Sequence, residues 1–271
     1  MLTVLDGPIG SLLAARGVAT PPPMWSAAAL VAAPDAVRRI HADYVAAGAT
    51  VHTADTFRTK RRQSGPAWRD LTRLALSIAR EAVPTGQLVA GSLSPLEDCY
   101  RPDLSPADAR PEHREMARAL VEEGADLILC ETFPHVGEAL IAVEEAVSTG
   151  APVWIAFTAG PEGELLTPDA IALGAREAAR RGASAVLVNC TAAAKTLPFV
   201  ERLSEAGVPF GAYANAGDAP EDFNRSVGDR AAEERYVQFA RSWVAAGATL
   251  IGSCCGTGPG HIAALRRALI G

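Results

Sequence analysis

Two adjacent cysteines, Cys254 and Cys255, lie among glycines in the stretch from Ile251 to His261. Neighbouring residues on a straight strand point to opposite faces, so both thiols can reach one ion only if the backbone turns there. Gly252 and Gly256 are expected to permit that turn. The pattern predicts a metal site on a loop that joins a strand to the helix that follows it.

A third soft ligand is available in Cys190, which directly follows the apolar run from Ala185 to Asn189. Three thiolates that meet at one end of a fold bind zinc and leave a fourth position open, as in catalytic sites. Because Cys190 is far from Cys254 in the sequence, only the tertiary fold can bring them together. The alternative is a buried Cys190 beside a vicinal disulfide or two packed thiols. We expect Zn²⁺ as the cofactor.

Two carboxylates also follow apolar runs, Asp6 before Gly7 and Glu131 after Cys130. Either could act as a general acid, a general base or an anchor for a cationic group. The structural alternatives are a turn residue for Asp6 and a helix cap or ion pair for Glu131. Cys130 is expected to face the other side of its strand, and Cys99 has no obvious partner.

Eight apolar runs alternate with amphipathic helical patterns, and these runs must position the reactive residues. The expected strands cover Leu2 to Leu5, Thr50 to Thr53, Leu88 to Gly91, Asp126 to Cys130, Val153 to Phe157, Ala185 to Asn189, Pro209 to Tyr213 and Thr249 to Ile251. Several strands are preceded by a glycine where a helix would close in a left-handed cap. The strand and helix units therefore recur without a tandem sequence repeat.

This alternation predicts the α/β class and a (β/α)8 TIM barrel formed by residues 1–271 as a single domain, about the length that such a barrel needs. A doubly wound open sheet is less favoured, because no GxGxxG motif follows the first strand. In a barrel the active site lies at the carboxyl ends of the strands. The residues expected there are Asp6, Gly7, Asp55, Thr56, Phe57, Ser92, Ser94, Glu131, Thr132, Phe133, Cys190, Asn215, Cys254 and Cys255.

Two segments near this end have open roles. The long polar connection from 214 to 230 is expected to be a lid or a disordered insertion. The glycines from Gly256 to Gly260 could instead hold a phosphate at a helix amino terminus. His261 could be a ligand, although a single histidine in the first turn of a helix is more often a surface or supporting residue.

The composition restricts the partners of the protein. Apolar residues make up 49% of the chain and aromatic residues 6%, which suits alternating α/β segments. A net charge of −6 argues against nucleic acid or an anionic membrane as a partner. The five cysteines, with no secretory segment at the amino terminus, predict reduced thiols and a cytoplasmic location.

These motifs resemble those of the zinc-dependent homocysteine S-methyltransferases, a family with betaine-dependent, S-methylmethionine-dependent and cobalamin-linked members. The resemblance rests on Leu5-Asp6-Gly7, Trp25-Ser26-Ala27, Thr56-Phe57, Ala90-Gly91-Ser92, Glu131-Thr132-Phe133, Val188-Asn189-Cys190 and Gly252-Ser253-Cys254-Cys255-Gly256-Thr257. Asp55 differs from the asparagine or serine that is more usual in the family, and Ala214 interrupts its Tyr-Pro-Asn.

The resemblance implies a role for each site residue. Cys190, Cys254 and Cys255 would hold the zinc, Glu131 would bind the homocysteine amine, and Asp6 with Gly7 would help to bind the amino acid. The reaction would be attack by the zinc-bound homocysteine thiolate on the methyl group of an onium donor, giving methionine.

Four aromatic or polar side chains are expected to shape the substrate pocket. Phe57, Phe133 and Tyr213 are candidates for its walls, and Asn215 for donor or substrate binding. Because no cobalamin or folate module follows the eighth helix in this sequence, the expected donor is a small free onium compound, with S-methylmethionine first. A phosphate-binding lyase or isomerase, and a zinc- or thiol-binding barrel without turnover, are the alternatives.

Overall fold

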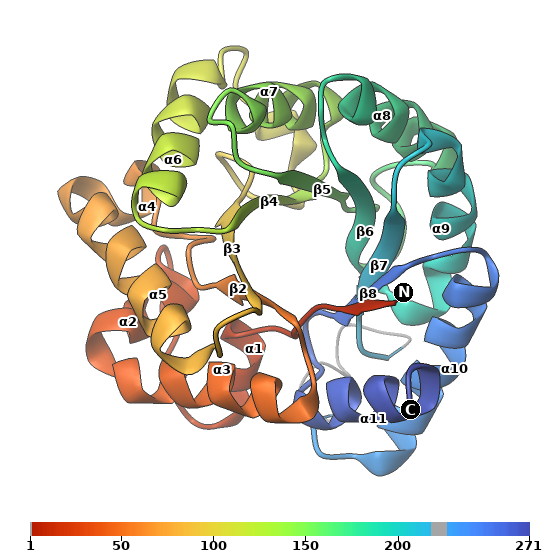
Figure 1. Cartoon of the computed structure of the whole chain (residues 1–271). Helices are drawn as coiled ribbons and strands as arrows, with labels where there is room; N and C mark the ends of the chain where they lie inside the picture. Colours follow the sequence, from red (N-terminus) through yellow and green to blue (C-terminus); the bar gives the residue numbers. More distant parts are fainter. Residues whose placement is uncertain (1, 218–226) are drawn as a thin grey trace.

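The computed structural model describes residues 2–217 and 227–271, and its centre is a ring of parallel strands (Figure 1). The strands are β1 (Thr3–Val4), β2 (Val51–Ala54), β3 (Leu88–Leu93), β4 (Leu127–Phe133), β5 (Val153–Phe157), β6 (Ala185–Ala192), β7 (Phe210–Asn215) and β8 (Leu250–Ser253). Each expected strand is present. The middle of the 214–230 connection lies outside the described residues.

The sheet closes on itself. Its order is β1-β8-β7-β6-β5-β4-β3-β2, and each neighbouring pair in this order is parallel. An isolated bridge between Leu5 and Val51 then joins β1 to β2, and the Asp6 amide donates to the Val51 carbonyl at 3.0 Å. The chain therefore forms the (β/α)8 TIM barrel that the alternation of segments predicted.

Helices surround the ring on its outer side (Figure 1). The α-helices are α1 (Gly10–Ala15), α2 (Ala29–Ala32), α3 (Pro34–Ala47), α4 (Arg61–Ser64), α5 (Trp68–Ala82), α6 (Arg110–Glu122), α7 (Val136–Val147), α8 (Pro168–Arg180), α9 (Leu197–Leu203), α10 (Arg230–Ala245) and α11 (Pro259–Leu269). Short 3-10 helices are η1 (Trp25–Ala28), η2 (Gly65–Ala67), η3 (Pro102–Leu104), η4 (Ala193–Lys195) and η5 (Ser204–Ala206). Within the described part of the chain, no helix is long and apolar enough to cross a membrane.

Two apolar clusters hold the barrel together. The larger one lies between the strands and the helices and includes the fully buried Trp243, whose ring meets that of Tyr236 edge to face at 5.7 Å. The smaller one fills the inside of the ring and includes Leu129, Leu187 and Tyr213. Side chains alternate between the two clusters along each strand, because successive residues point to opposite faces.

Several strands run further than expected at their carboxyl ends, and the extensions of β4 and β6 carry site residues. β4 continues through Glu131 to Phe133, and β6 continues through Cys190 to Ala192. The expected strands stopped where the apolar run stopped. Both extensions include polar side chains, because the inner face of the barrel at its carboxyl end faces the site and not the core.

Candidate active site

The carboxyl end of β6 holds its cysteine in an unusual backbone conformation. Cys190 has a φ of 52°, and the pairing of β6 with β7 shifts register between Asn189 and Ala192. On a regular strand Cys190 would face the helices, as Val188 does. The left-handed backbone conformation of Cys190 lets its thiol reach the inner side of the barrel instead. Positive φ is rare and strained in a residue other than glycine.

The segment after β8 brings the paired cysteines to the same place. The Cys254 amide donates to the Ala214 carbonyl at 2.8 Å, and the Ala216 amide donates to the Cys255 carbonyl at 2.9 Å, so β7 holds both cysteines. Gly256 makes the turn with a φ of 80°.

The expectation for Gly252 is wrong. Gly252 lies within β8 and does not have a positive φ, so the chain does not turn there. Its role is close packing, because an added Cβ would lie 2.8 Å from the Cβ of Leu5 and 3.1 Å from that of Tyr213.

The structure gathers the three thiols. Their sulfur atoms all lie within 4.8 Å of one another, and the Sγ atoms of Cys190 and Cys254 are 2.8 Å apart. All five cysteines of the chain are free thiols, so the vicinal disulfide is not formed. Hydrogen bonds from Cys190 and Cys254 hold the pKa of Cys255 well below its usual value. A buried cluster of thiols with one favoured thiolate is a donor set suited to a soft metal ion.

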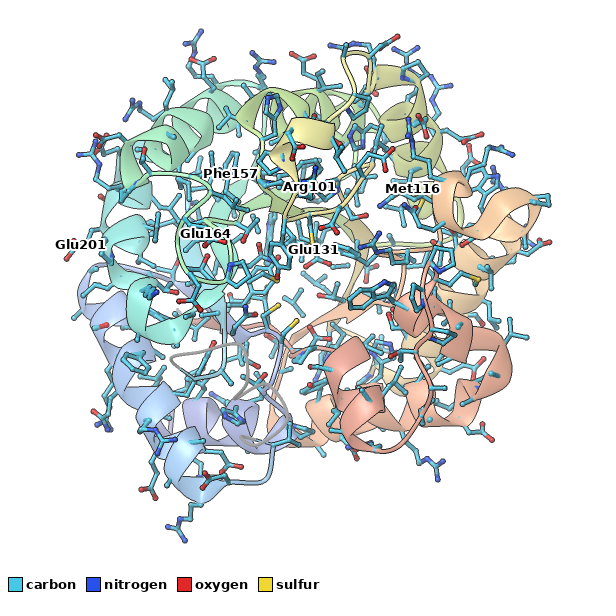
Figure 2. The ribbon with its side chains drawn as sticks, turned by 180° about the vertical axis from the view of Figure 1, so that it is seen from behind. Arg101, Met116, Glu131, Phe157, Glu164 and Glu201 are labelled. Atoms are coloured by element: carbon cyan, nitrogen blue, oxygen red, sulfur yellow. The ribbon has the colours of Figure 1, made fainter. Side chains whose placement is uncertain are left out.

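Two buried carboxylates, Asp6 and Glu131, belong to the same carboxyl end of the barrel, and Figure 2 shows Glu131 near the middle of the ring. The Ser92 hydroxyl donates to one oxygen of Glu131, and the Tyr213 hydroxyl donates to the other at 3.0 Å. Burial raises the pKa of Glu131 to about 7, even though these two hydrogen bonds lower it. Two hydrogen-bond donors therefore hold the carboxylate in place. They offset only part of the free energy that burying its charge costs.

Asp6 lies at the seam of the barrel. Its Oδ2 accepts from the Thr53 amide at 2.9 Å, and burial raises its pKa well above the usual carboxyl range. The charge of Glu131 adds to that increase, which places the two acids within electrostatic reach of each other. Gly7 packs tightly, since a Cβ there would lie 2.6 Å from the Tyr44 hydroxyl and 2.8 Å from the Ser253 hydroxyl.

The remaining expected site residues fall into different places. Asn215 donates from Nδ2 to the Cys190 carbonyl at 3.0 Å, and its buried Oδ1 has no partner among the described residues. Tyr213 lies inside the ring, and Phe57 is half-buried after β2.

Phe133 does not line the pocket, which corrects the expectation. It is fully buried in the outer cluster, with its ring centroid 5.8 Å from that of His113 on α6. The cause is a register shift between Cys130 and Phe133, where Thr132 has a φ of 64°. Glu131 faces inward by regular alternation after Cys130, and the shift at Thr132 then turns Phe133 outward.

Two supporting residues, Asn189 and Tyr100, were not among the residues expected at the site. The amide nitrogen of Asn189 donates to the Thr132 hydroxyl at 2.8 Å and to the Cys190 sulfur at 3.4 Å. Partial burial, with the nearby thiols, raises the pKa of Tyr100, which places this ring close to the cysteines. Tyr100 belongs to the irregular connection after β3, where no periodic pattern predicts position.

The other candidate ligands lie elsewhere. Cys130 packs in the outer cluster, as expected from its place before Glu131, and Cys99 is buried outside the thiol group. His261 is buried and caps α11, with its Nδ1 accepting from the Gly258 amide at 3.3 Å. His261 is therefore a supporting residue of the helix start and not part of the thiol cluster.

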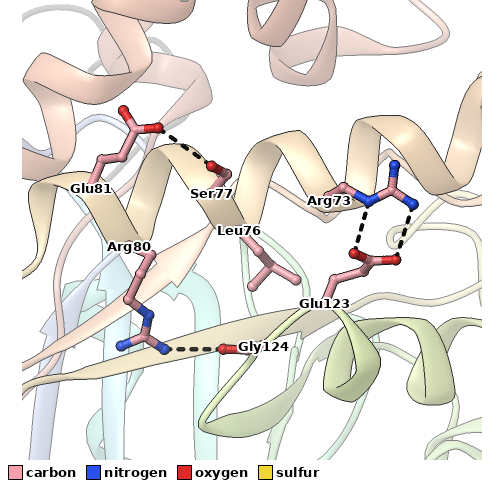
Figure 3. A pocket seen from close by; sticks show the side chains of 7 residues that line it. All are labelled: Arg73, Leu76, Ser77, Arg80, Glu81, Glu123 and Gly124. Atoms are coloured by element: carbon pink, nitrogen blue, oxygen red, sulfur yellow. Dashed lines mark hydrogen bonds and ion pairs between the residues drawn. The ribbon is translucent and has the colours of Figure 1, made fainter.

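A groove on the outer surface is unsuited to catalysis (Figure 3). Its lining residues are Arg73, Leu76, Ser77, Arg80, Glu81, Glu123 and Gly124. The charges are already paired, since Arg73 meets Glu123 at 3.0 Å and Arg80 donates to the Gly124 carbonyl at 3.0 Å. The carboxyl end of the barrel strands is thus the stronger candidate for the active site.

Comparison with known proteins agrees with this geometry. A sequence model of the family described as homocysteine S-methyltransferase matches residues 3–269. The chain belongs to the homocysteine S-methyltransferase family. The match covers β1 through α11 and so includes the three thiols and both inner carboxylates.

Named members of the homocysteine S-methyltransferase family match over nearly the whole chain. The homocysteine S-methyltransferase YbgG of Bacillus subtilis is 32% identical, with 96% of this chain and 92% of that protein covered. The homocysteine S-methyltransferase of Escherichia coli is also 32% identical, with 98% and 94% covered. The S-methylmethionine–homocysteine S-methyltransferase BHMT2 of Pongo abelii is 30% identical, with 91% of this chain and 72% of that protein covered.

Solved structures of a homocysteine methyltransferase also superpose on this chain. The homocysteine methyltransferase MmuM of Escherichia coli in its metallated form superposes with a TM-score of 0.81 at 28% identity, covering 98% of this chain and 96% of that one. Its oxidised and apo forms superpose with TM-scores of 0.79 and 0.74.

Proposed function

We propose that this protein transfers a methyl group from S-methylmethionine to the sulfur of homocysteine, with zinc held by Cys190, Cys254 and Cys255. The observation that carries the proposal is the group of three thiols within 4.8 Å at the inner end of the barrel, in a chain of this family. The metallated form of a related enzyme adds support for the metal.

The thiols fit zinc by their chemistry. Three cysteine sulfurs and one open position are a known catalytic donor set, and all three side chains are buried or half-buried. Bound zinc would lower the pKa of the homocysteine thiol, so that its sulfur is present as a thiolate at neutral pH.

The protein's own groups would orient the substrate and exclude water. Glu131, fixed by Ser92 and Tyr213, is placed to accept hydrogen bonds from the homocysteine ammonium group. Asp6, held by the Thr53 amide and within electrostatic reach of Glu131, contributes a second carboxylate. A water-poor pocket favours the reaction, because a thiolate and an onium cation neutralise each other in the transition state.

A donor panel tests the proposed reaction. Zinc-loaded protein is incubated with homocysteine and, separately, with S-methylmethionine, S-adenosylmethionine, betaine or methylcobalamin, and methionine is measured. We expect methionine from S-methylmethionine, because a sulfonium is a better methyl leaving group than a quaternary ammonium. Methionine from betaine, or only from methylcobalamin, with none from either sulfonium, would contradict the donor but leave the thiol site standing.

The structure gives no support to the phosphate-binding alternative. A Cβ added at Gly260, in the first turn of α11, would lie 1.8 Å from the Glu233 carboxylate. A carboxylate therefore already lies at the helix amino terminus where a phosphate would bind, and two anions repel each other there.

Asn189 offers a test of how the metal site is supported. Asn189→Ala removes the hydrogen bonds to Cys190 and Thr132, and we expect zinc affinity to fall about tenfold while the fold is kept. Competition with a chelator measures the affinity. Asn189→Asp, which replaces the donating amide by an anion beside a thiolate, should weaken zinc binding at least as much. Unchanged affinity in both variants would show that this amide does not support the site.

A further inference from the structure

The loop after β2 begins with Asp55, a buried carboxylate of which only one oxygen accepts a hydrogen bond. The Ser26 hydroxyl donates to Oδ1 of Asp55 at 2.6 Å. Oδ2 is buried and has no hydrogen-bond partner among the described residues, and the side chain as a whole is 4% exposed. Buried polar atoms are almost always hydrogen-bonded, so an acceptor left open at this depth points to a ligand that donates to it.

Asp55 belongs to the same end of the barrel as the thiols. It directly follows β2, and Ser26 lies on η1, which follows β1 at that end. The pKa of Glu131, raised chiefly by burial, is raised further by the charges of Cys255 and Asp55. Asp55 is therefore within electrostatic reach of the carboxylate proposed to bind homocysteine.

The same loop carries a cation without an ion-pair partner. The guanidinium of Arg58 lies 5.7 Å from the ring centroid of Trp25 and 5.5 Å from that of Phe57. No carboxylate of the described residues forms an ion pair with Arg58, unlike its neighbours Arg61 and Arg62.

Trp25 is itself unusual. Its side chain is 55% exposed and its φ is 49°. A bulky residue in that conformation is strained, and such strain concentrates at ligand-binding sites.

We propose that this loop binds the amino-acid head of the methyl donor, with Asp55 accepting hydrogen bonds from its ammonium group and Arg58 binding its carboxylate. This rests on the proposed function. Glu131 and Asp6 are both assigned to homocysteine, so the ammonium group of the donor needs a carboxylate of its own. Asp55 and Arg58, three residues apart on one loop, supply opposite charges for a zwitterionic group.

The test compares two donors that differ only in the ammonium group. They are S-methylmethionine and 4-(dimethylsulfonio)butanoate, which is the same molecule with hydrogen in place of the amine. For Asp55→Asn we expect kcat/KM for S-methylmethionine to fall about tenfold or more, from loss of a charge-assisted hydrogen bond. The value for the deaminated donor, and the KM for homocysteine, should stay within about twofold.

Arg58→Gln should lower kcat/KM for both donors, because both carry the carboxylate. Asp70→Asn, at an exposed position on α5, serves as the control and should change neither value. Zinc content and circular dichroism confirm that each variant is folded.

An equal loss for both donors in Asp55→Asn would overturn the ammonium role, and a raised KM for homocysteine would assign Asp55 to the other substrate. Either result leaves the proposed reaction intact. A wild-type enzyme that forms methionine from betaine and from neither S-methylmethionine nor its deaminated analogue would contradict both the donor and this inference.

Discussion

Replacing Cys190 with alanine is expected to leave a folded protein that holds no zinc and transfers no methyl group. The variant removes one of three sulfur donors and leaves a site with two thiols, which binds zinc far more weakly. Without the metal the homocysteine thiol is mostly protonated at neutral pH, since a free thiol has a pKa near 8.5. Elemental analysis should fall from about one zinc per chain to nearly none.

Cys130→Ala is the matched control for this experiment. The residue type is the same and the position is equally buried, but its side chain packs in the outer cluster. We expect it to keep its zinc and activity and to lose only stability, by about 1 kcal/mol for the small cavity. Stoichiometric zinc in a folded Cys190→Ala protein would show that Cys190 is not a ligand.

Glu131→Gln is expected to weaken homocysteine binding by roughly ten- to a hundredfold and to leave zinc in place. The amide keeps the size of the side chain but not its charge, and a hydrogen bond to a charged group contributes about 1.5 to 3 kcal/mol. Isothermal titration of the zinc-loaded variant with homocysteine measures the affinity, and metal analysis of the same sample measures zinc.

Glu234→Gln is the control for the loss of charge, because Glu234 lies on the outer surface of α10 and is largely exposed. It should bind homocysteine as the wild type does. If Glu131→Gln gave the wild-type titration curve, the ammonium anchor would have to be another group, with Asp6 the next candidate.

The barrel and the meeting of the three cysteines could be predicted because both depend on patterns that the sequence displays directly. Short, mostly apolar runs marked the buried parts of the strands, and parallel strands in a barrel share one carboxyl end. Cys190 and Cys254 each come after such a run. The topology of a barrel alone therefore predicts that both lie at the same end of it.

The local backbone at the site could not be predicted, and this explains the errors. The two left-handed residues, Thr132 and Cys190, are types that seldom adopt positive φ, so no residue preference indicated a bulge. Regular alternation therefore placed Phe133 on the wrong face of β4. Tyr100 was not predicted to lie near the cysteines, because long-range packing decides the position of an irregular loop.

The closure of the ring has a consequence for how the protein is made. β1 pairs with β8 over two residues, and β1 meets β2 through a single bridge, so the ring cannot close until β8 has left the ribosome. Until then the chain exposes two open sheet edges and lacks two of its three thiols. Because Cys254 and Cys255 directly follow β8, one short segment completes both the ring and the metal site. A nascent chain therefore gains its full set of proposed zinc donors only as the barrel closes, which would tie metal capture to the last step of folding.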